Sequence, residues 1–168
     1  FLDVAGIEPP ESMTAKSLMP LLKSNKNGQV QIERDSVVTG RERHVATARE
    51  GYLPYPQRAI RTADFLYIIN FEPDRWPAGD PIGLDDPTTI PPSREELLSM
   101  AFGLYKTAFP DIDASPTKAW MVHNRAKKDV QPLFDLGFGK RPKEELYDLR
   151  KDPDYLTNVA NDPIYLEI

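Results

Sequence analysis

The sequence contains no cysteine and only two histidines, His44 and His123. The lack of cysteine excludes disulfide bonds, thiolate metal sites and a cysteine nucleophile. Two histidines are too few for an ordinary zinc site built by the protein alone. We therefore predict no metal site within this chain, while the compartment in which it works stays undetermined.

Long apolar runs and an excess of positive charge are also missing. No segment is long and apolar enough to cross a bilayer, and the formal net charge is −5. We therefore expect neither a membrane nor a nucleic acid as a partner. The sequence also lacks a glycine-rich phosphate loop, a metalloprotease helix motif and a nucleophile elbow. We assign no catalytic residue because no complete active site is present.

The length of 168 residues suits one domain with its own core. The chain begins at Phe1 without a methionine, and residues 1–6 are typical of the last turn of an apolar helix closed by Gly6. We expect the chain to be a single domain, residues 1–168, cut from a longer protein.

Short alternating or β-branched segments predict four strands. These segments are residues 36–40, 57–61, 64–71 and 145–149. The third is apolar on both sides, which places it inside the sheet. Helical patterns fall between the third and fourth strands. We therefore expect an α+β fold, in which helices pack on one face of a four-stranded antiparallel sheet.

Capping signals predict the helices. A capping box at Ser93 favours a helix that ends before Pro110, and Ser115 followed by proline favours another. Asp152 precedes a third predicted helix, residues 153–160, whose apolar stripe needs a packing partner. Asp162 repeats the cap-then-proline signal close to the last residue.

The densest group of polar residues, residues 39–44, follows the first predicted strand. If the chain stays extended, Arg41 and Arg43 share one side, and Glu42 and His44 share the other. Two adjacent guanidinium groups can hold a sulfate, phosphate or carboxylate. The alternative is a solvated strand end whose charges pair with one another.

Other candidates are less specific. The aromatic and proline-rich segment 52–58, with Tyr55 and Arg58, is either a pocket wall or a structural connection. Trp76 either binds a ligand or anchors its loop to the core. His123, one helical turn from Trp120, is a packed or half-exposed helix residue more often than a catalyst.

Four stretches together resemble the C-terminal part of the type I sulfatases, especially the heparan N-sulfatases (sulfamidases) and their bacterial relatives. They are residues 1–7 with Pro9, residues 38–44, residues 55–62 running into 65–68, and residues 145–149 with Asp152-Pro153. Their order and spacing match across essentially the whole chain. The long proline-rich insertion after the third predicted strand favours the N-sulfatase branch.

The resemblance implies that an N-terminal catalytic domain, of alkaline-phosphatase type, precedes this chain. In the family that domain carries a formylglycine, made from the cysteine or serine of a C/S-x-P-x-R motif, and a calcium ion. The present sequence has no such motif, since Ser115-Pro116-Thr117-Lys118 lacks the arginine. The chain would then be the smaller C-terminal subdomain, inactive alone, which packs against its own catalytic domain.

The resemblance also favours residues 41–44 as part of a pocket for a sulfated sugar. Glu42 and His44 would contact the sugar, Arg41 or Arg43 would bind an acidic substituent, and Tyr55 and Arg58 are further candidates. An exported, periplasmic or lysosomal enzyme is implied. Two alternatives stay open: a non-catalytic carbohydrate-binding or interaction module, and a phosphoesterase or phosphonate hydrolase of the same superfamily.

Overall fold

The computed structural model describes residues 1–82, 84 and 108–167. It divides into two compact units, Phe1–Asp35 and Ser36–Ile168, which are treated separately below. The helix predicted to begin at Ser93 lies outside the described residues.

The first unit contains two short helices, α1 (Leu2–Ala5) and α2 (Met19–Leu22), and none of its residues is buried. Gly6 closes α1 in the left-handed conformation, with φ of 67°, and its N–H bonds to the carbonyl of Asp3. This confirms the predicted glycine-capped helical turn, because a glycine adopts positive φ without steric cost.

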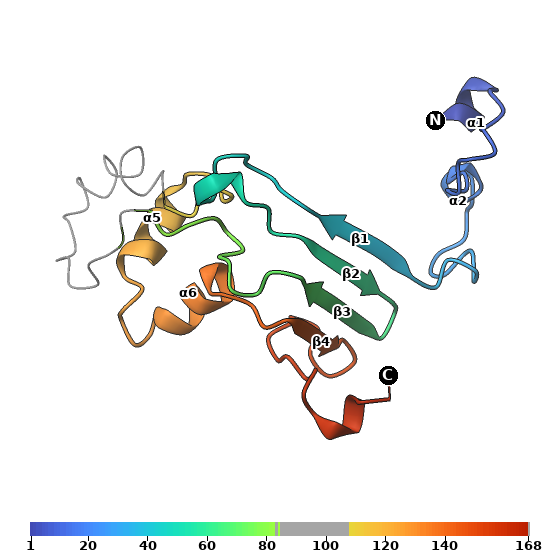
Figure 1. Ribbon diagram of the computed structural model, residues 1–168. Helices are drawn as coiled ribbons and strands as arrows, with labels where there is room; N and C mark the ends of the chain where they lie inside the picture. The colour runs from blue at the N-terminus through green and yellow to red at the C-terminus, as the bar shows by residue number, and fades with distance from the viewer. Residues whose placement is uncertain (83, 85–107, 168) are drawn as a thin grey trace. The chain divides into compact units, whose positions relative to one another are not determined.

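The second unit is built on a four-stranded antiparallel sheet (Figure 1). Its strands are β1 (Val37–Arg41), β2 (Gln57–Arg61), β3 (Phe65–Asn70) and β4 (Glu144–Asp148), in the order β1-β2-β3-β4. All four predicted strands are confirmed, with ends that differ by a residue or so. The strand that is apolar on both sides, β3, lies inside the sheet as predicted.

Strand pairing defines the two faces of the sheet. Gln57 lies opposite both Arg41 and Asn70, and Tyr147 lies opposite Leu66. These side chains therefore share one face, here called the Tyr147 face, because paired residues point the same way. The other face, called the Leu146 face, carries Val38, Arg58, Ile60, Tyr67 and Leu146.

The segment after β4 is not the helix predicted for residues 153–160. Tyr155 has φ of 58°, which a right-handed helix does not allow. The Val159 N–H bonds to the Leu146 carbonyl at 2.8 Å, and Asn158 Oδ1 accepts from the Leu146 N–H at 2.9 Å. The segment thus bonds to the outer edge of β4 instead of forming a helix, and Leu156 stays exposed.

The residues that follow also contact β4 through the buried carboxylate of Asp148. Asp148 accepts from Arg150 Nε at 2.8 Å and from the Tyr165 hydroxyl at 3.0 Å. These partners, the arginine first, hold the Asp148 pKa well below its usual range. Tyr165 belongs to the 3₁₀ turn η2 (Pro163–Tyr165), in which Asp162 caps the Ile164 N–H, so the second cap signal starts a single turn.

Two helices lie beyond the ends of the strands (Figure 1). The predicted α5 (Pro116–His123) is capped by Ser115 Oγ, which accepts from the Lys118 N–H at 3.1 Å. The other helix, α6 (Gln131–Phe138), was not predicted, because Val130 at its N-cap gives no capping signal and Gly137 within it is a weak helix former. The predicted packing of helices on one face of the sheet is corrected to packing at its end.

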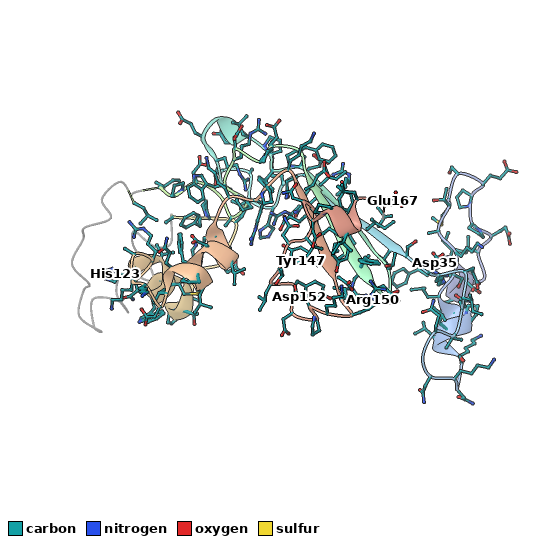
Figure 2. All side chains as sticks on the ribbon, turned by 90° about the horizontal axis from the view of Figure 1, so that it is seen from below. Asp35, His123, Tyr147, Arg150, Asp152 and Glu167 are labelled. Atoms are coloured by element: carbon teal, nitrogen blue, oxygen red, sulfur yellow. The ribbon has the colours of Figure 1, made fainter. Side chains whose placement is uncertain are left out.

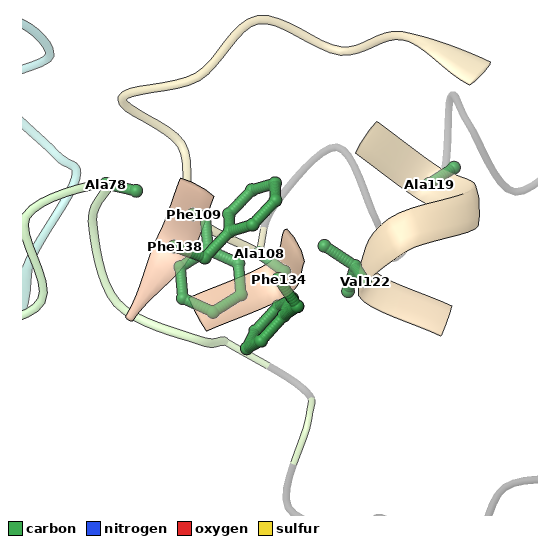
Figure 3. Packing of buried hydrophobic residues seen from close by; sticks show 7 residues of the cluster. All are labelled: Ala78, Ala108, Phe109, Ala119, Val122, Phe134 and Phe138. Carbon is green, nitrogen blue, oxygen red and sulfur yellow. The ribbon is translucent and has the colours of Figure 1, made fainter. Parts of the chain in front are cut away.

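A hydrophobic core joins these helices to two loops, as Figure 3 shows. Its buried members are Ala78, Ala108, Phe109, Ala119, Val122, Phe134 and Phe138. Trp76 packs against this core, with its ring centroid 5.6 Å from that of Phe109. Trp76 therefore anchors its loop, which was one of the two roles considered for it.

Candidate functional site

The predicted segment 41–44 turns toward two neighbouring loops. Arg41 donates from Nη2 to the Pro77 carbonyl at 3.1 Å, and His44 donates from Nδ1 to the Asp111 carbonyl at 3.2 Å. Regular extension ends at Arg41, so the predicted alternation of sides does not continue through His44. Arg41 is half-buried, whereas Arg43 and His44 are both exposed.

Glu42 and Arg58 pair with each other on the opposite side. Arg58 Nη2 bonds to Glu42 Oε1, and both side chains are about half exposed. Gly40 makes room for this arrangement, because a Cβ there would lie 2.9 Å from Arg58 Cδ. An exposed pair of this kind contributes little stability. For Glu42 and Arg58, the structure therefore matches the alternative considered above, in which charged residues at a strand end pair with one another.

A buried ion pair fixes the loops that Arg41 and His44 contact. Arg49 Nη2 bonds to Asp111 Oδ2 at 2.8 Å, and each side chain is 2% exposed. Arg49 also donates from Nε to the Trp76 carbonyl and from Nη2 to the Pro77 carbonyl, both at 2.8 Å. The second carboxylate oxygen of Asp111 accepts from the Val45 N–H at 2.8 Å. The pair therefore holds three loops together.

Sequence reasoning did not single out Arg49 or Asp111. Arg49 is followed directly by Glu50, and Asp111 lies two residues before Asp113, so nothing local indicates that Arg49 and Asp111 pair with each other. The only local signal is a cationic residue, Arg49, next to Ala48 in a stretch otherwise rich in small and polar residues. Their partnership joins positions far apart in the sequence.

Tyr55 is a buried candidate residue at the centre of this polar region. It is 1% exposed, its hydroxyl has no hydrogen-bond partner among the described residues, and Arg49 lies 5.5 Å from its ring centroid. Burial raises the Tyr55 pKa, and the charge of Glu145 adds to that effect. Tyr55 is therefore a neutral phenol whose ring lies beside the guanidinium group of Arg49.

A second buried chain of hydrogen bonds runs across the end of the sheet. Asn70 Nδ2 donates to Glu145 Oε1 at 2.7 Å, and the Tyr147 hydroxyl donates to Glu145 Oε2 at 2.6 Å. Burial, followed by the hydrogen bond to Glu145, raises the Tyr147 pKa. Asn70 Oδ1 is buried and has no partner in the described structure.

A cavity of about 480 Å³ lies on the Tyr147 face, and its lining includes neither His44 nor Tyr55. Arg41, Gln57, Arg141, Glu145 and Tyr147 line it, and Leu66 and Ile68 contribute apolar surface. The volume lies in the range typical of small-molecule sites. Arginine, carboxylate and aromatic groups around one cavity can bind a ligand that carries both a negative charge and hydrogen-bond donors.

His123 does not belong to this site. Figure 2 shows His123 at the helical end of the unit, whereas Tyr147 lies on the sheet. Burial, with Lys127 and Arg125 adding to it, lowers the His123 pKa. His123 is thus a buried helix residue.

No group of three or more histidine, aspartate or glutamate side chains in the described ranges is arranged to hold a metal ion. Among the helices that the structure describes, none has the length and apolar character needed to span a membrane. No protein-family model matches the chain, and no curated protein is significantly similar to it.

Proposed function

We propose that this chain is the C-terminal part of a sulfatase that hydrolyses sulfate esters or sulfamates of sulfated sugars, most like an N-sulfoglucosamine sulfohydrolase. It forms a wall of the substrate pocket and takes part in recognition. The formylglycine nucleophile and the calcium ion belong to the N-terminal catalytic domain, which is its partner within the longer protein.

The observation that carries this proposal is the placement of Arg41 and His44. Both come from the segment that the sulfatase resemblance favours, and both hydrogen-bond to loops that the buried Arg49–Asp111 pair holds in place. A recognition surface requires side chains whose supports are rigid. The four-stranded antiparallel sheet is also the architecture that the resemblance implies.

The first test is the coding sequence upstream of Phe1. A C/S-x-P-x-R motif there supports the proposal, and its absence favours a non-catalytic binding or interaction module. The longer protein should then release sulfate from N-sulfoglucosamine or from a sugar sulfate ester. Turnover of phosphorylated sugars alone would instead indicate a phosphoesterase of the same superfamily.

The second test concerns His44 in that longer protein. Replacing it with alanine removes a donor at the proposed pocket wall, so kcat/KM should fall by about tenfold or more. Lys26→Ala is the control, since Lys26 lies in an exposed loop of the first unit. Equal kcat/KM for wild type and His44→Ala would remove His44 from the pocket.

A further inference from the structure

The cavity on the Tyr147 face contains two arginines without acidic partners. Arg41 and Arg141 both line it and both are half-buried. Arg41 bonds to the Pro77 carbonyl and Arg141 bonds to the Leu136 carbonyl, and neither forms an ion pair with any described residue. Partly desolvated guanidinium groups without a carboxylate have strong unused capacity for an anion.

Three buried residues near the lining carry polar atoms without partners in the described structure. Tyr55 Oη, Arg49 Nη1 and Asn70 Oδ1 are buried polar atoms without partners among the described residues. Asn70 bonds to Glu145 and Arg49 bonds to Asp111. Both of these partners line the cavity, whereas Tyr55, Asn70 and Arg49 themselves do not. Since buried polar groups are nearly always paired, these atoms mark the region behind the cavity lining as unusually polar.

The remaining wall accepts hydrogen bonds. Glu145 lines the cavity and is 5% exposed, and its described hydrogen bonds come from the uncharged donors of Asn70 and Tyr147. Asp154 adds a second carboxylate to the lining. The cavity thus offers cationic donors, anionic acceptors and the aromatic rings of Tyr147 and Tyr155.

We propose that this cavity binds a small polyhydroxylated organic anion, whose acidic group lies between Arg41 and Arg141 and whose hydroxyl groups face Glu145. An uncharged polyol would leave the two guanidinium groups without an anion. A purely apolar anion would leave the buried carboxylate of Glu145 facing apolar atoms, which is costly. The ligand therefore combines one negative group with several hydroxyl groups.

Arg41 is shared with the proposed sulfatase pocket wall, but binding in the cavity requires no catalytic domain. The 168-residue chain can therefore be tested alone, and the result is independent of whether a longer protein cleaves sulfate. Titration calorimetry with glucuronate, glucose 6-sulfate and glucose compares a carboxylate, a sulfate ester and a neutral sugar that share the same pyranose ring. Saturable binding of either anion, with glucose at least about tenfold weaker, is the expected result.

Variants locate the binding. Arg41→Met and Arg141→Met retain the apolar stem but remove the guanidinium, and each should weaken binding of the anion by about tenfold or more. Lys143→Met is the matched control, because it removes one positive charge two residues from Arg141 without altering the cavity lining. Thermal unfolding of each variant checks that it is folded.

Three outcomes overturn the proposal. They are no saturable binding of glucuronate or glucose 6-sulfate, equal binding of glucose, and unchanged binding by folded Arg41→Met and Arg141→Met proteins. A preference for glucuronate over glucose 6-sulfate, or the reverse, identifies the acidic group that the arginines select.

Discussion

Two ion pairs between charged side chains differ sharply in their surroundings. Arg49 and Asp111 are 2% exposed and connect three loops, whereas the side chains of Arg58 and Glu42 are about half exposed. The buried charges depend on each other, because water does not solvate either one after the partner is removed. Residue type alone does not distinguish the two pairs.

Removing one member of the buried pair should destabilise the second unit strongly. Arg49→Met and Asp111→Leu should each lower the free energy of unfolding by about 3–5 kcal/mol, since each leaves an uncompensated buried charge. Urea denaturation measures the effect. The double variant should be more stable than the sum of the single losses predicts.

The exposed pair provides the control for this experiment. Arg58→Met should cost less than about 1 kcal/mol. An equally small effect of Asp111→Leu would show that the buried pair does not hold the loops.

His123 should make stability depend on pH. Its folded-state pKa is lowered by burial, and then by Lys127 and Arg125. The unfolded chain therefore binds the proton more tightly than the folded one, so stability is complete above the unfolded pKa of about 6.5 and falls as pH decreases below it.

Unfolding free energies of wild type and His123→Gln between pH 5 and 7.5 test this effect. The variant should show a flatter profile in that interval. A profile parallel to that of wild type would mean that His123 titrates alike in both states.

At the scale of elements, local patterns predicted the strands well. The apolar residues of β3 and the β-branched residues of β1 favour an extended backbone locally. Both strands could therefore be predicted without knowing which distant residues they contact. Residues 153–160 carry an equally clear local helix signal, but β4 offers unpaired backbone groups at its outer edge, and bonding to them replaces the helix. The sequence of residues 153–160 alone does not indicate that the edge of β4 is available as a hydrogen-bonding partner.

The candidate site shows the same division. Arg41, His44 and Tyr55 were identified because they cluster near a strand or share a motif. Arg49, Asn70, Asp111, Arg141 and Glu145 were missed, because only the folded sheet and its loops bring them together. Glu42 and Arg58 were predicted as site residues, but in the structure they bond to each other on the side away from the cavity.

Asn158 should be essential for the attachment of the C-terminal segment to β4. Its Oδ1 accepts from the Leu146 N–H, and its Nδ2 donates to the Glu144 carbonyl at 3.1 Å. Asn158→Ala removes both bonds, together with the one that Oδ1 accepts from the Ala160 N–H, and should cost about 1–3 kcal/mol. Amide exchange at Leu146 should accelerate.

Thr157→Ala is the neighbouring control, because only the backbone N–H of Thr157 forms a described hydrogen bond. Unchanged protection of the Leu146 amide in Asn158→Ala would contradict the assigned bond.

At the scale of the whole molecule, apolar surface remains uncovered on the sheet. Val37 and Val38 are 61% and 71% exposed, and Ile60 is 40% exposed. A subdomain that packs against a catalytic domain should expose such a surface when it is alone. Val38 and Ile60 share the Leu146 face, so this face is the proposed contact in the longer protein.

Replacing Val38 with lysine should reduce binding of the dye ANS by the isolated chain, because it interrupts the apolar surface. The free energy of unfolding should change by no more than about 0.5 kcal/mol, as expected for an exposed position. Asn27→Lys, at an exposed neutral position, is a control for the added positive charge. Dye binding equal to that of wild type would show that Val38 is not part of an accessible apolar surface.

The side chain of Asn158 has a consequence for how the sheet can grow. By bonding to both Glu144 and Leu146, it occupies the backbone groups that another strand would need in order to pair with β4. The opposite edge, β1, has no such cover among the described residues of its unit. Strand addition, whether by a peptide or by a second molecule during aggregation, is therefore directed to β1, and lysine or proline substitutions that suppress aggregation belong on that strand.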